Sequence, residues 1–289
     1  MLFLQLLLQG LQVGALYALT AAGFALIFGA TRIFHFAHGS AFTLAGYTFL
    51  FATQAGWPWW LGGLAGVVVA TLFGLGIYWF VYRPIQRHEG SFFTVFVAAF
   101  GVGIVVQNLI GMTAGRGFAS VDTPLSRAVE VLPDVFLADV FWVAIGISVL
   151  LFAALSLFLT RHNAGVALRA LHQNPDLLRA YGLSSTKLSL LAFALGSALA
   201  APAAILTAMT SGLNEAIGHH VMLISMAATI VGGVGSLRGA ALAGLMLGVA
   251  EAVALSFVDT QWAEAVSFLV LFAFILFRPS GIFGIAQAR

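Results

Sequence analysis

The chain has 289 residues, of which 61% are hydrophobic and only 8% are charged, with a net charge of +2 and no cysteine. An ordinary soluble domain carries about 25% charged residues, so this composition excludes a soluble globular protein, and the small net charge gives no reason to expect a nucleic-acid partner. Without cysteine, the chain has neither disulfides nor thiolate metal sites. Its apolar runs are long and continuous, which favours membrane helices over barrel strands.

Apolar segments follow one another along the chain and predict an all-α polytopic membrane protein with about 8–9 transmembrane helices in a single domain, residues 1–289. The first segment lacks a basic region and a cleavage site, so it is predicted to be a membrane helix rather than a removed signal peptide. The second, seventh and last segments are short for a full crossing. The predicted spans are residues 2–30, 41–56, 61–82, 92–112, 140–160, 188–211, 221–237, 240–258 and 263–277.

The basic residues lie mainly on one side of the predicted membrane. Ten of the twelve fall there: Arg32, Arg83, Arg87, Arg161, Arg169, Arg179, Lys187, Arg238, Arg278 and Arg289. The positive-inside rule makes this side cytoplasmic, with the C-terminus inside and the N-terminus outside. The long loop 113–139 then lies outside the cell membrane. It is either a solvated loop with a short surface helix or part of a landing site for an extracytoplasmic partner.

Motifs for enzymatic chemistry are absent from the sequence. No G-x-x-x-x-G-K-[ST] run is present, so the chain cannot bind ATP through a P-loop. The glycine-rich run 231–240 lacks the spacing of a phosphate loop, and it predicts tight turns and close helix packing instead. His219 and His220 are adjacent and point in different directions, which favours a polar cap over a metal site. The chain is therefore expected to have no catalytic, cofactor-binding or metal-binding residues.

Glycines inside the apolar segments predict a closely packed bundle, because small residues let membrane helices approach each other. Pro202 is expected to kink the sixth span, since it lacks an N–H group and clashes with the preceding turn. The G-x-x-x-G pairs include Gly10 with Gly14, Gly111 with Gly115, and Gly244 with Gly248.

A few polar residues within or beside the spans are candidates for a transport pathway or a gate. Glu251 is the most conspicuous, because a carboxylate at membrane depth is costly and should face the bundle interior or water. It is either a pathway residue or an anchor bonded to a neighbouring helix. Gln107 and Asn108 raise the same question. His35 and His38 lie three residues apart near the inner end of the first span, where a packing role is the simpler interpretation.

The segment 161–187 is a polar, basic island between apolar runs. Asn163 is predicted to cap a helix over residues 164–173. Asn174, Pro175 and Asp176 form a second start signal, with the proline at the first helical position. Gly182 can end that helix in a left-handed conformation. A simple connecting loop does not need two capped helices, so the island favours a rigid cytoplasmic docking surface.

The ordered set of motifs is similar to that of one family. It comprises GLQVGALYALTAAGFALIFG, FAHG at 36–39, YRPIQ at 82–86, GVALRALHQNPDLLRAYGL, VGGVGSLRGA at 231–240 and FRPSGIFG at 277–284. With these pieces the chain resembles, nearly end to end, the permease subunits of bacterial ABC importers for branched-chain amino acids, in particular the shorter H-type permease. The resemblance implies a type II ABC-importer-like permease fold in the bacterial inner membrane and a transport subunit rather than an enzyme.

The resemblance also implies partners and roles. Family members act with a second permease, two ATP-binding subunits that hold ATP and Mg, and an extracytoplasmic solute-binding protein. The island would be the coupling element that docks on the ATPase. The residues that match the family's pattern there are Gly165, Arg169, Ala170, Pro175, Asp176 and Gly182.

Two departures from the family leave the substrate open. His35 stands where the family usually has asparagine, and Ala201-Pro202 stands where it usually has glycines. The expected substrate is a branched-chain or other hydrophobic amino acid, with urea, short amides or another small organic solute as the alternative. A stand-alone ion-coupled secondary transporter is the alternative from a different class. It would need several buried ionisable groups, and Glu251 is the only good candidate.

Overall fold

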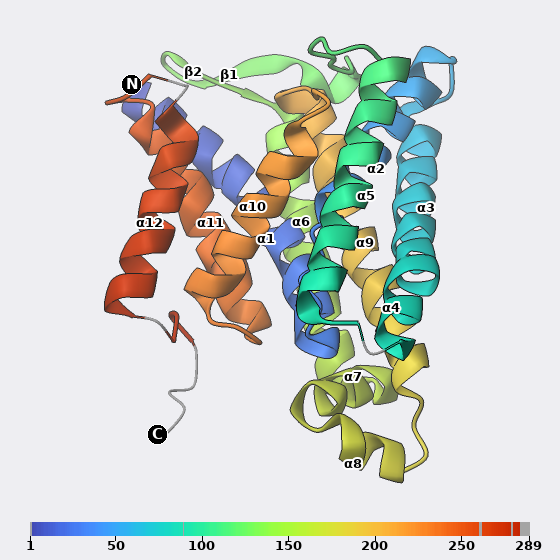
Figure 1. Ribbon diagram of the computed structural model, residues 1–289. Helices are drawn as coiled ribbons and strands as arrows, with labels where there is room; N and C mark the ends of the chain where they lie inside the picture. Colours follow the sequence, from blue (N-terminus) through green and yellow to red (C-terminus); the bar gives the residue numbers. More distant parts are fainter. Residues whose placement is uncertain (1, 89, 260–261, 279, 284–289) are drawn as a thin grey trace.

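The computed structural model describes residues 2–88, 90–259, 262–278 and 280–283. Arg289, which contributes to the predicted orientation, and Pro279 and Gly284 of the last matching motif lie outside the described residues. Within them, nine long helices form the bundle in Figure 1. These are α1 Leu2–Thr31, α2 His38–Gln54, α3 Trp59–Ile77, α5 Phe92–Thr113, α6 Asp139–Arg161, α9 Ser185–Thr210, α10 Ile217–Gly232, α11 Leu237–Ala254 and α12 Ala263–Phe277.

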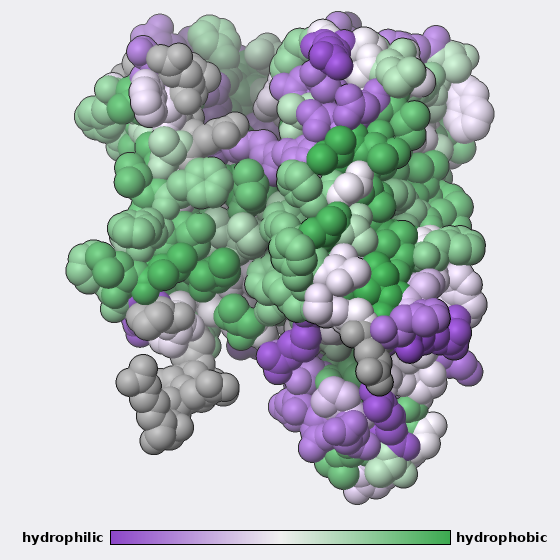
Figure 2. Space-filling view, in the orientation of Figure 1, coloured by the Kyte–Doolittle hydropathy of each residue, from purple (hydrophilic) through white to green (hydrophobic). Residues whose placement is uncertain are grey.

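The long helices have the composition of membrane spans. Six of those in the described segments are both long and apolar enough to cross a bilayer, and α10 and α12 add shorter apolar helices. The three segments predicted to be short are confirmed, since α2, α10 and α12 have 17, 16 and 15 residues. Sixteen residues extend only about 24 Å, against roughly 30 Å of hydrocarbon. Figure 2 shows the matching surface, with a broad hydrophobic band and hydrophilic residues gathered at both ends.

Helix α1 lies at the centre of the bundle. In its most apolar window 83% of the residues are buried, against 28% in each of α3, α5 and α6, whose outer sides present apolar residues to lipid. Packing against α11 is the closest of its contacts. An added Cβ at Gly248 would overlap the backbone of Gly14, and one at Gly14 would lie 3.0 Å from the Leu245 Cα. Two of the named G-x-x-x-G pairs therefore face each other.

The turn between α10 and α11 starts earlier than the sequence predicts. Helix α10 ends at Gly232, not near residue 237, because Gly233 and Gly235 adopt positive φ angles of 101° and 89°. Ser236 then caps α11 by accepting a 3.0 Å hydrogen bond from the Gly239 N–H. Gly232 and Gly239 are in backbone contact across the turn. The prediction of tight turns and close packing in this glycine-rich run is confirmed.

The connection between α5 and α6 contains a β-hairpin that the sequence analysis did not predict. A short 3₁₀ turn, η2 Pro124–Ser126, precedes the antiparallel strands β1 Ala128–Leu132 and β2 Val135–Ala138. Asp134 occupies the turn with a φ of 61°. Gln5 of α1 holds the hairpin: its amide donates to the Phe136 carbonyl at 2.7 Å and accepts from the Phe136 N–H at 2.9 Å. The hairpin thus covers one end of the bundle (Figure 1).

The opposite end carries the polar island as two short helices, α7 Asn163–Gln173 and α8 Pro175–Ala180 (Figure 1). At the same end, α3 continues through a π-helical turn, η1 Tyr78–Tyr82, into α4 Arg83–Arg87. Helix α9 runs without interruption through Pro202. The expected kink at Pro202 stays a prediction.

Candidate functional site: the α7–α8 element and the buried polar residues

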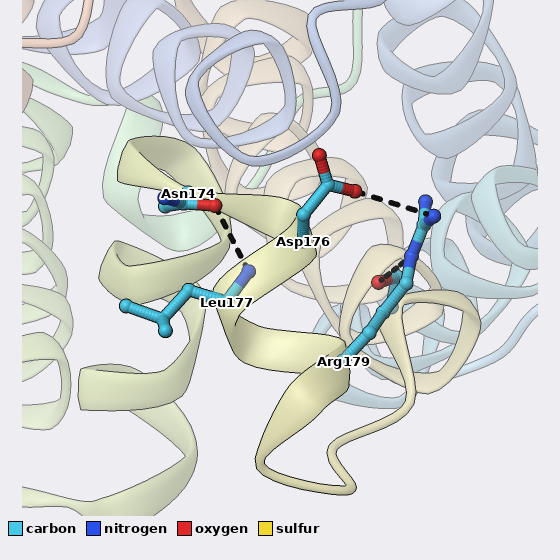
Figure 3. A network of polar contacts seen from close by, with 5 residues as sticks. Asn174, Asp176, Leu177 and Arg179 are labelled. Carbon is cyan, nitrogen blue, oxygen red and sulfur yellow. Dashed lines mark hydrogen bonds and ion pairs between the residues drawn. The ribbon is translucent and has the colours of Figure 1, made fainter.

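The local signals of the island produce the helices expected from them, with one shift. Asn174 caps α8, as predicted: its side-chain oxygen accepts a 2.9 Å hydrogen bond from the Leu177 N–H (Figure 3). Gly182 follows α8 with a φ of 76°, as expected for a left-handed stop. The predicted cap of α7 is wrong by one residue. His162 takes that place, because its Nδ1 accepts from the Ala164 N–H at 3.2 Å and Asn163 is already helical.

The element is held against the bundle by apolar side chains and by one histidine. Leu168, Leu171 and Leu178 are each less than 5% exposed. His172 Nδ1 forms a short hydrogen bond with the Gly29 carbonyl near the end of α1. The Arg32 guanidinium donates to the His172 carbonyl at 3.4 Å. Helix α7 therefore has a direct polar connection to α1.

The six predicted coupling residues divide into two groups. Gly165 is buried, and an added Cβ would overlap the Phe158 carbonyl oxygen and lie 2.6 Å from the Leu159 Cα, so this glycine lets α7 pack against the end of α6. Ala170 is half-buried. The others lie on the surface of the element, where a partner can reach them: Arg169, Pro175, Asp176 and Gly182.

The charges of α8 form a weak surface network. Asp176 and Arg179 are 3.6 Å apart, with exposed side chains, and the Arg179 Nε donates to Ser185 Oγ at 3.3 Å (Figure 3). An exposed ion pair of this kind contributes roughly 0–1 kcal/mol to stability. These side chains are therefore free to exchange their contacts for those of a partner at little cost.

An exposed apolar patch on the element was missed by the sequence analysis. Leu177, Tyr181 and Leu183 are 54%, 79% and 46% exposed, and they line a groove of about 200 Å³ with Ala170 and Asn174. Figure 2 shows hydrophobic atoms among hydrophilic ones at this end of the molecule. Apolar side chains on a part that projects beyond the apolar band mark a protein-interaction surface. The signal was present in the run L-L-R-A-Y-G-L, where α8 exposes Leu177 while Leu178 is buried.

His35 and His38 are fully buried and hold helices together. His35 Nδ1 lies 2.8 Å from the Tyr82 hydroxyl, and His38 Nε2 lies 3.1 Å from the Thr20 carbonyl of α1. Burial, with the nearby His38, holds the pKa of His35 well below its ordinary value of 6.5, so this imidazole is neutral. The two residues face the protein interior and connect α1, α2 and η1, which fits a packing role.

The Tyr82→Phe variant is expected to be less stable than the native protein by about 1–3 kcal/mol, because it removes the only hydrogen bond that the described residues give the buried His35 ring. Tyr47→Phe is the matched control. The Tyr47 hydroxyl is buried without a hydrogen-bond partner in the described residues, so its loss should be neutral or stabilising. Thermal unfolding of the purified variants in detergent measures the difference. Equal melting temperatures would contradict the structural role of the His35–Tyr82 bond.

Glu251 is bonded to a neighbouring helix, as one of its two interpretations expected. Its carboxylate lies 3.8 Å from His220 Nε2 of α10, and the same nitrogen is 2.8 Å from the Tyr17 hydroxyl of α1. The three side chains connect α1, α10 and α11. This arrangement supports the anchor interpretation.

The remaining pathway candidates lie in three different places. Asn108 is exposed and donates to the Ile104 carbonyl of its own helix at 2.8 Å, which satisfies its amide. Pro202 borders an apolar hollow of about 340 Å³ between α3, α6 and α9. Gln107 alone of these residues lines a polar cleft, together with Glu215 and His219. The structure therefore does not gather the six candidates into one site.

A bundle of long apolar helices that exposes a capped, two-helix element at one end is the architecture of an α-helical polytopic membrane protein. The chain belongs to the family described as branched-chain amino acid transport system / permease component, whose model matches residues 6–275.

The similarity to known relatives extends over nearly the whole chain. It is 30% identical to the high-affinity branched-chain amino acid transport system permease protein BraD of Pseudomonas aeruginosa, with 98% of this chain and 96% of BraD covered. It is 29% identical to the corresponding permease protein LivH of Escherichia coli K12, with the same coverage of 98% and 96%. A solved structure of PsaBC from Streptococcus pneumoniae in complex with Fab has a similar fold, with a TM-score of 0.56 at 14% identity over 97% of this chain and 94% of that one.

Proposed function

We propose that this chain is a membrane-spanning permease subunit of an ATP-driven importer of branched-chain amino acids. The observation that carries the proposal is the α7–α8 element, which presents exposed charges and an exposed apolar patch while His172 connects it to α1. A solitary ion-coupled transporter has no use for such a surface. The ionisable side chain that would serve ion coupling best, Glu251, lies 3.8 Å from His220 Nε2, where it connects α11 to α10.

The proposal gives the chain an orientation and partners. Helices α7 and α8 and the C-terminus lie in the cytoplasm, and the N-terminus and the hairpin lie outside, as the distribution of basic residues favours. The assembly contains two ATP-binding subunits, which hold ATP and Mg, and one of them docks on α7–α8 of this chain. A second permease completes the membrane part, and an extracytoplasmic solute-binding protein delivers the substrate. The substrate class follows from the names of the relatives BraD and LivH.

Copurification from detergent-solubilised membranes tests the coupling. The native chain is expected to retain an ATPase subunit, and a variant with Arg169→Glu and Asp176→Arg is expected to lose it, because both exposed charges reverse. Arg87→Glu is the control, since Arg87 is an exposed basic residue outside the element. If no ATPase accompanies the folded native chain, the importer proposal fails.

Uptake measurements in cells that lack this chain test the substrate. Leucine, isoleucine and valine uptake should fall when the chain is absent, return with the native chain, and require the ATPase. Loss of urea or short-amide uptake instead would support the alternative substrates. Uptake that persists without the ATPase and collapses with a protonophore would support the ion-coupled alternative.

A further inference from the structure

A narrow polar cleft lies between α2, α5 and α10, in the half of the bundle away from α7–α8. Its polar lining residues come from three separate parts of the chain: Ser40 and Thr43 of α2, Gln107 of α5, and Glu215 and His219 at the start of α10. Ser40 and Thr43 are buried, and the other three are half-buried. Polar groups at membrane depth that face an interior space usually belong to a substrate or ion pathway.

Most of these side chains are uncommitted, unlike the polar residues elsewhere in the bundle. Within the described residues, no side-chain hydrogen bond or ion pair engages Ser40, Gln107, Glu215 or His219. The contrast lies within one turn of α10. His220 is hydrogen-bonded to Tyr17 and lies 3.8 Å from Glu251, whereas the His219 ring turns to the other side, with its centroid 6.0 Å from that of Phe100. Polar groups without a protein partner in a partly buried cleft are available to bind a ligand.

An apolar wall stands beside the polar groups. Phe36 and Val106 line the cleft. Phe36 in turn packs against Phe96 and Phe100, with ring centroids 4.5 and 6.4 Å away. The cleft thus combines one carboxylate, neutral hydrogen-bonding groups and an apolar surface. A zwitterion with an apolar side chain has the complementary set of groups.

We propose that this cleft is a binding site on the transport pathway for the zwitterionic amino acid, a proposal that rests on the proposed function. Glu215 receives the ammonium group. Gln107, His219 and Ser40 donate hydrogen bonds to the carboxylate. Phe36 and Val106 contact the apolar side chain of the substrate.

The structure shows the cleft closed. Its free volume is about 10 Å³, which is room for roughly one water molecule. On one side α2 and α10 are in close contact through the backbones of Gly39 and Gly218, which favours a fixed wall there. Helix α5 is the third wall, and the described residues pack it mainly against α2 and η1, with Val105, Leu109 and Met112 exposed. Opening therefore requires α5 to move away from α10.

Gly103 lies on α5, the helix that is expected to move, so a side chain at this position occupies the cleft in its opened state. An added Cβ there would lie 3.8 Å from His219 Nε2 and 3.9 Å from Ser40 Oγ, which is ordinary contact. In Gly103→Leu the longer side chain occupies the space proposed for the substrate, and leucine uptake by cells with the complete importer should fall on the order of tenfold or more. Gly101→Leu is the matched control on the same helix, since its Cβ meets nothing within 4 Å, and its uptake should equal the native rate.

Glu215→Gln tests the assigned role of the carboxylate with a side chain of equal size. The KM for leucine should rise on the order of tenfold, as expected for the loss of a charge-assisted hydrogen bond. The purified complex of permeases and ATPase, without the solute-binding protein, should bind leucine and its analogues that keep the ammonium group but not isocaproate, which lacks it. The variant should lose this discrimination, a change that a merely structural role of Glu215 would not produce.

Membrane abundance and ATPase copurification, measured for every variant, separate folding defects from pathway defects. If the native importer takes up leucine and both variants match it in rate, KM and discrimination, the cleft assignment is overturned and the proposed function stands. If the native importer takes up no amino acid, the proposed function itself fails, and the assigned ligand fails with it.

Discussion

The Gly248→Ala variant is expected to unfold at a lower temperature than the native protein, by several degrees. Even a Cβ at position 248 would overlap the backbone of Gly14, and backbone atoms cannot rotate away as a flexible side chain can. Helices α1 and α11 must then separate along the whole Gly10–Gly14 and Gly244–Gly248 contact. Overpacking of a close-packed interior costs about 1–3 kcal/mol, and the apolar window of α1 is the most buried among the six candidate membrane spans of the described residues. Thermal unfolding of purified protein in detergent measures the effect.

The Gly111–Gly115 pair provides the control. At Gly111 the nearest atoms to an added Cβ are those of Arg116, at 3.6 and 3.8 Å, so the same substitution makes only ordinary contacts. Gly111→Ala should melt at the native temperature. Equal melting temperatures for the Gly111 and Gly248 variants would show that the α1–α11 contact does not limit stability.

The Gly165→Leu variant should lose the ATPase subunit and with it most of the transport. A side chain at position 165 meets the backbone of Phe158 and Leu159 in the last turns of α6, so α7 cannot keep its place on the bundle. Displacement of α7 also breaks the contact of His172 with α1. Uptake is expected to fall by more than about tenfold. The reason is that a conformational change driven by ATP in the docked subunit can no longer pass through α7 to the membrane helices. Copurification and uptake measured together check this result.

Val166→Leu is the neighbouring control, because Val166 is 45% exposed on the same helix and a larger side chain there meets solvent. It should keep both the ATPase and the native uptake rate. Retention of the ATPase by a folded Gly165→Leu protein would contradict the assignment of α7–α8 as the docking element.

Local features of the sequence predicted much of this fold. Helix α8 begins at the predicted residue, Pro175, and ends at Ala180, one residue before the predicted end, since Asn174, Pro175 and Gly182 act on the backbone beside them. The apolar segments predicted the nine long helices of the described chain, because length and hydropathy are properties of each segment alone. The hairpin was missed although V-E-V and P-D carry a strand and turn pattern, since its pairing and its bonds to Gln5 depend on distant residues.

The arrangement of polar residues was less predictable. A helical segment does not reveal which neighbour each side faces. Gln107 and Asn108 are adjacent, yet only Gln107 lines the cleft. The sequence correctly implied that His219 and His220 point apart, but Glu215 and Tyr17 carried no signal. In the sequence, Tyr17 is an ordinary aromatic residue of an apolar span. Only the packing of α10 against α1 places His220 Nε2 2.8 Å from its hydroxyl group.

The two attachments of α1 have a mechanical consequence. This helix of 30 residues is about 45 Å long and runs obliquely through the bundle in Figure 1, longer than the roughly 30 Å of hydrocarbon that it crosses. Near one end of α1, Gln5 is hydrogen-bonded to the hairpin. At the other end, the Gly29 carbonyl is hydrogen-bonded to His172 of α7, and Arg32, which directly follows α1, donates to the His172 carbonyl. Because one stiff helix carries polar contacts at both ends, we expect a tilt of α7 to shift the hairpin at the opposite end of the bundle.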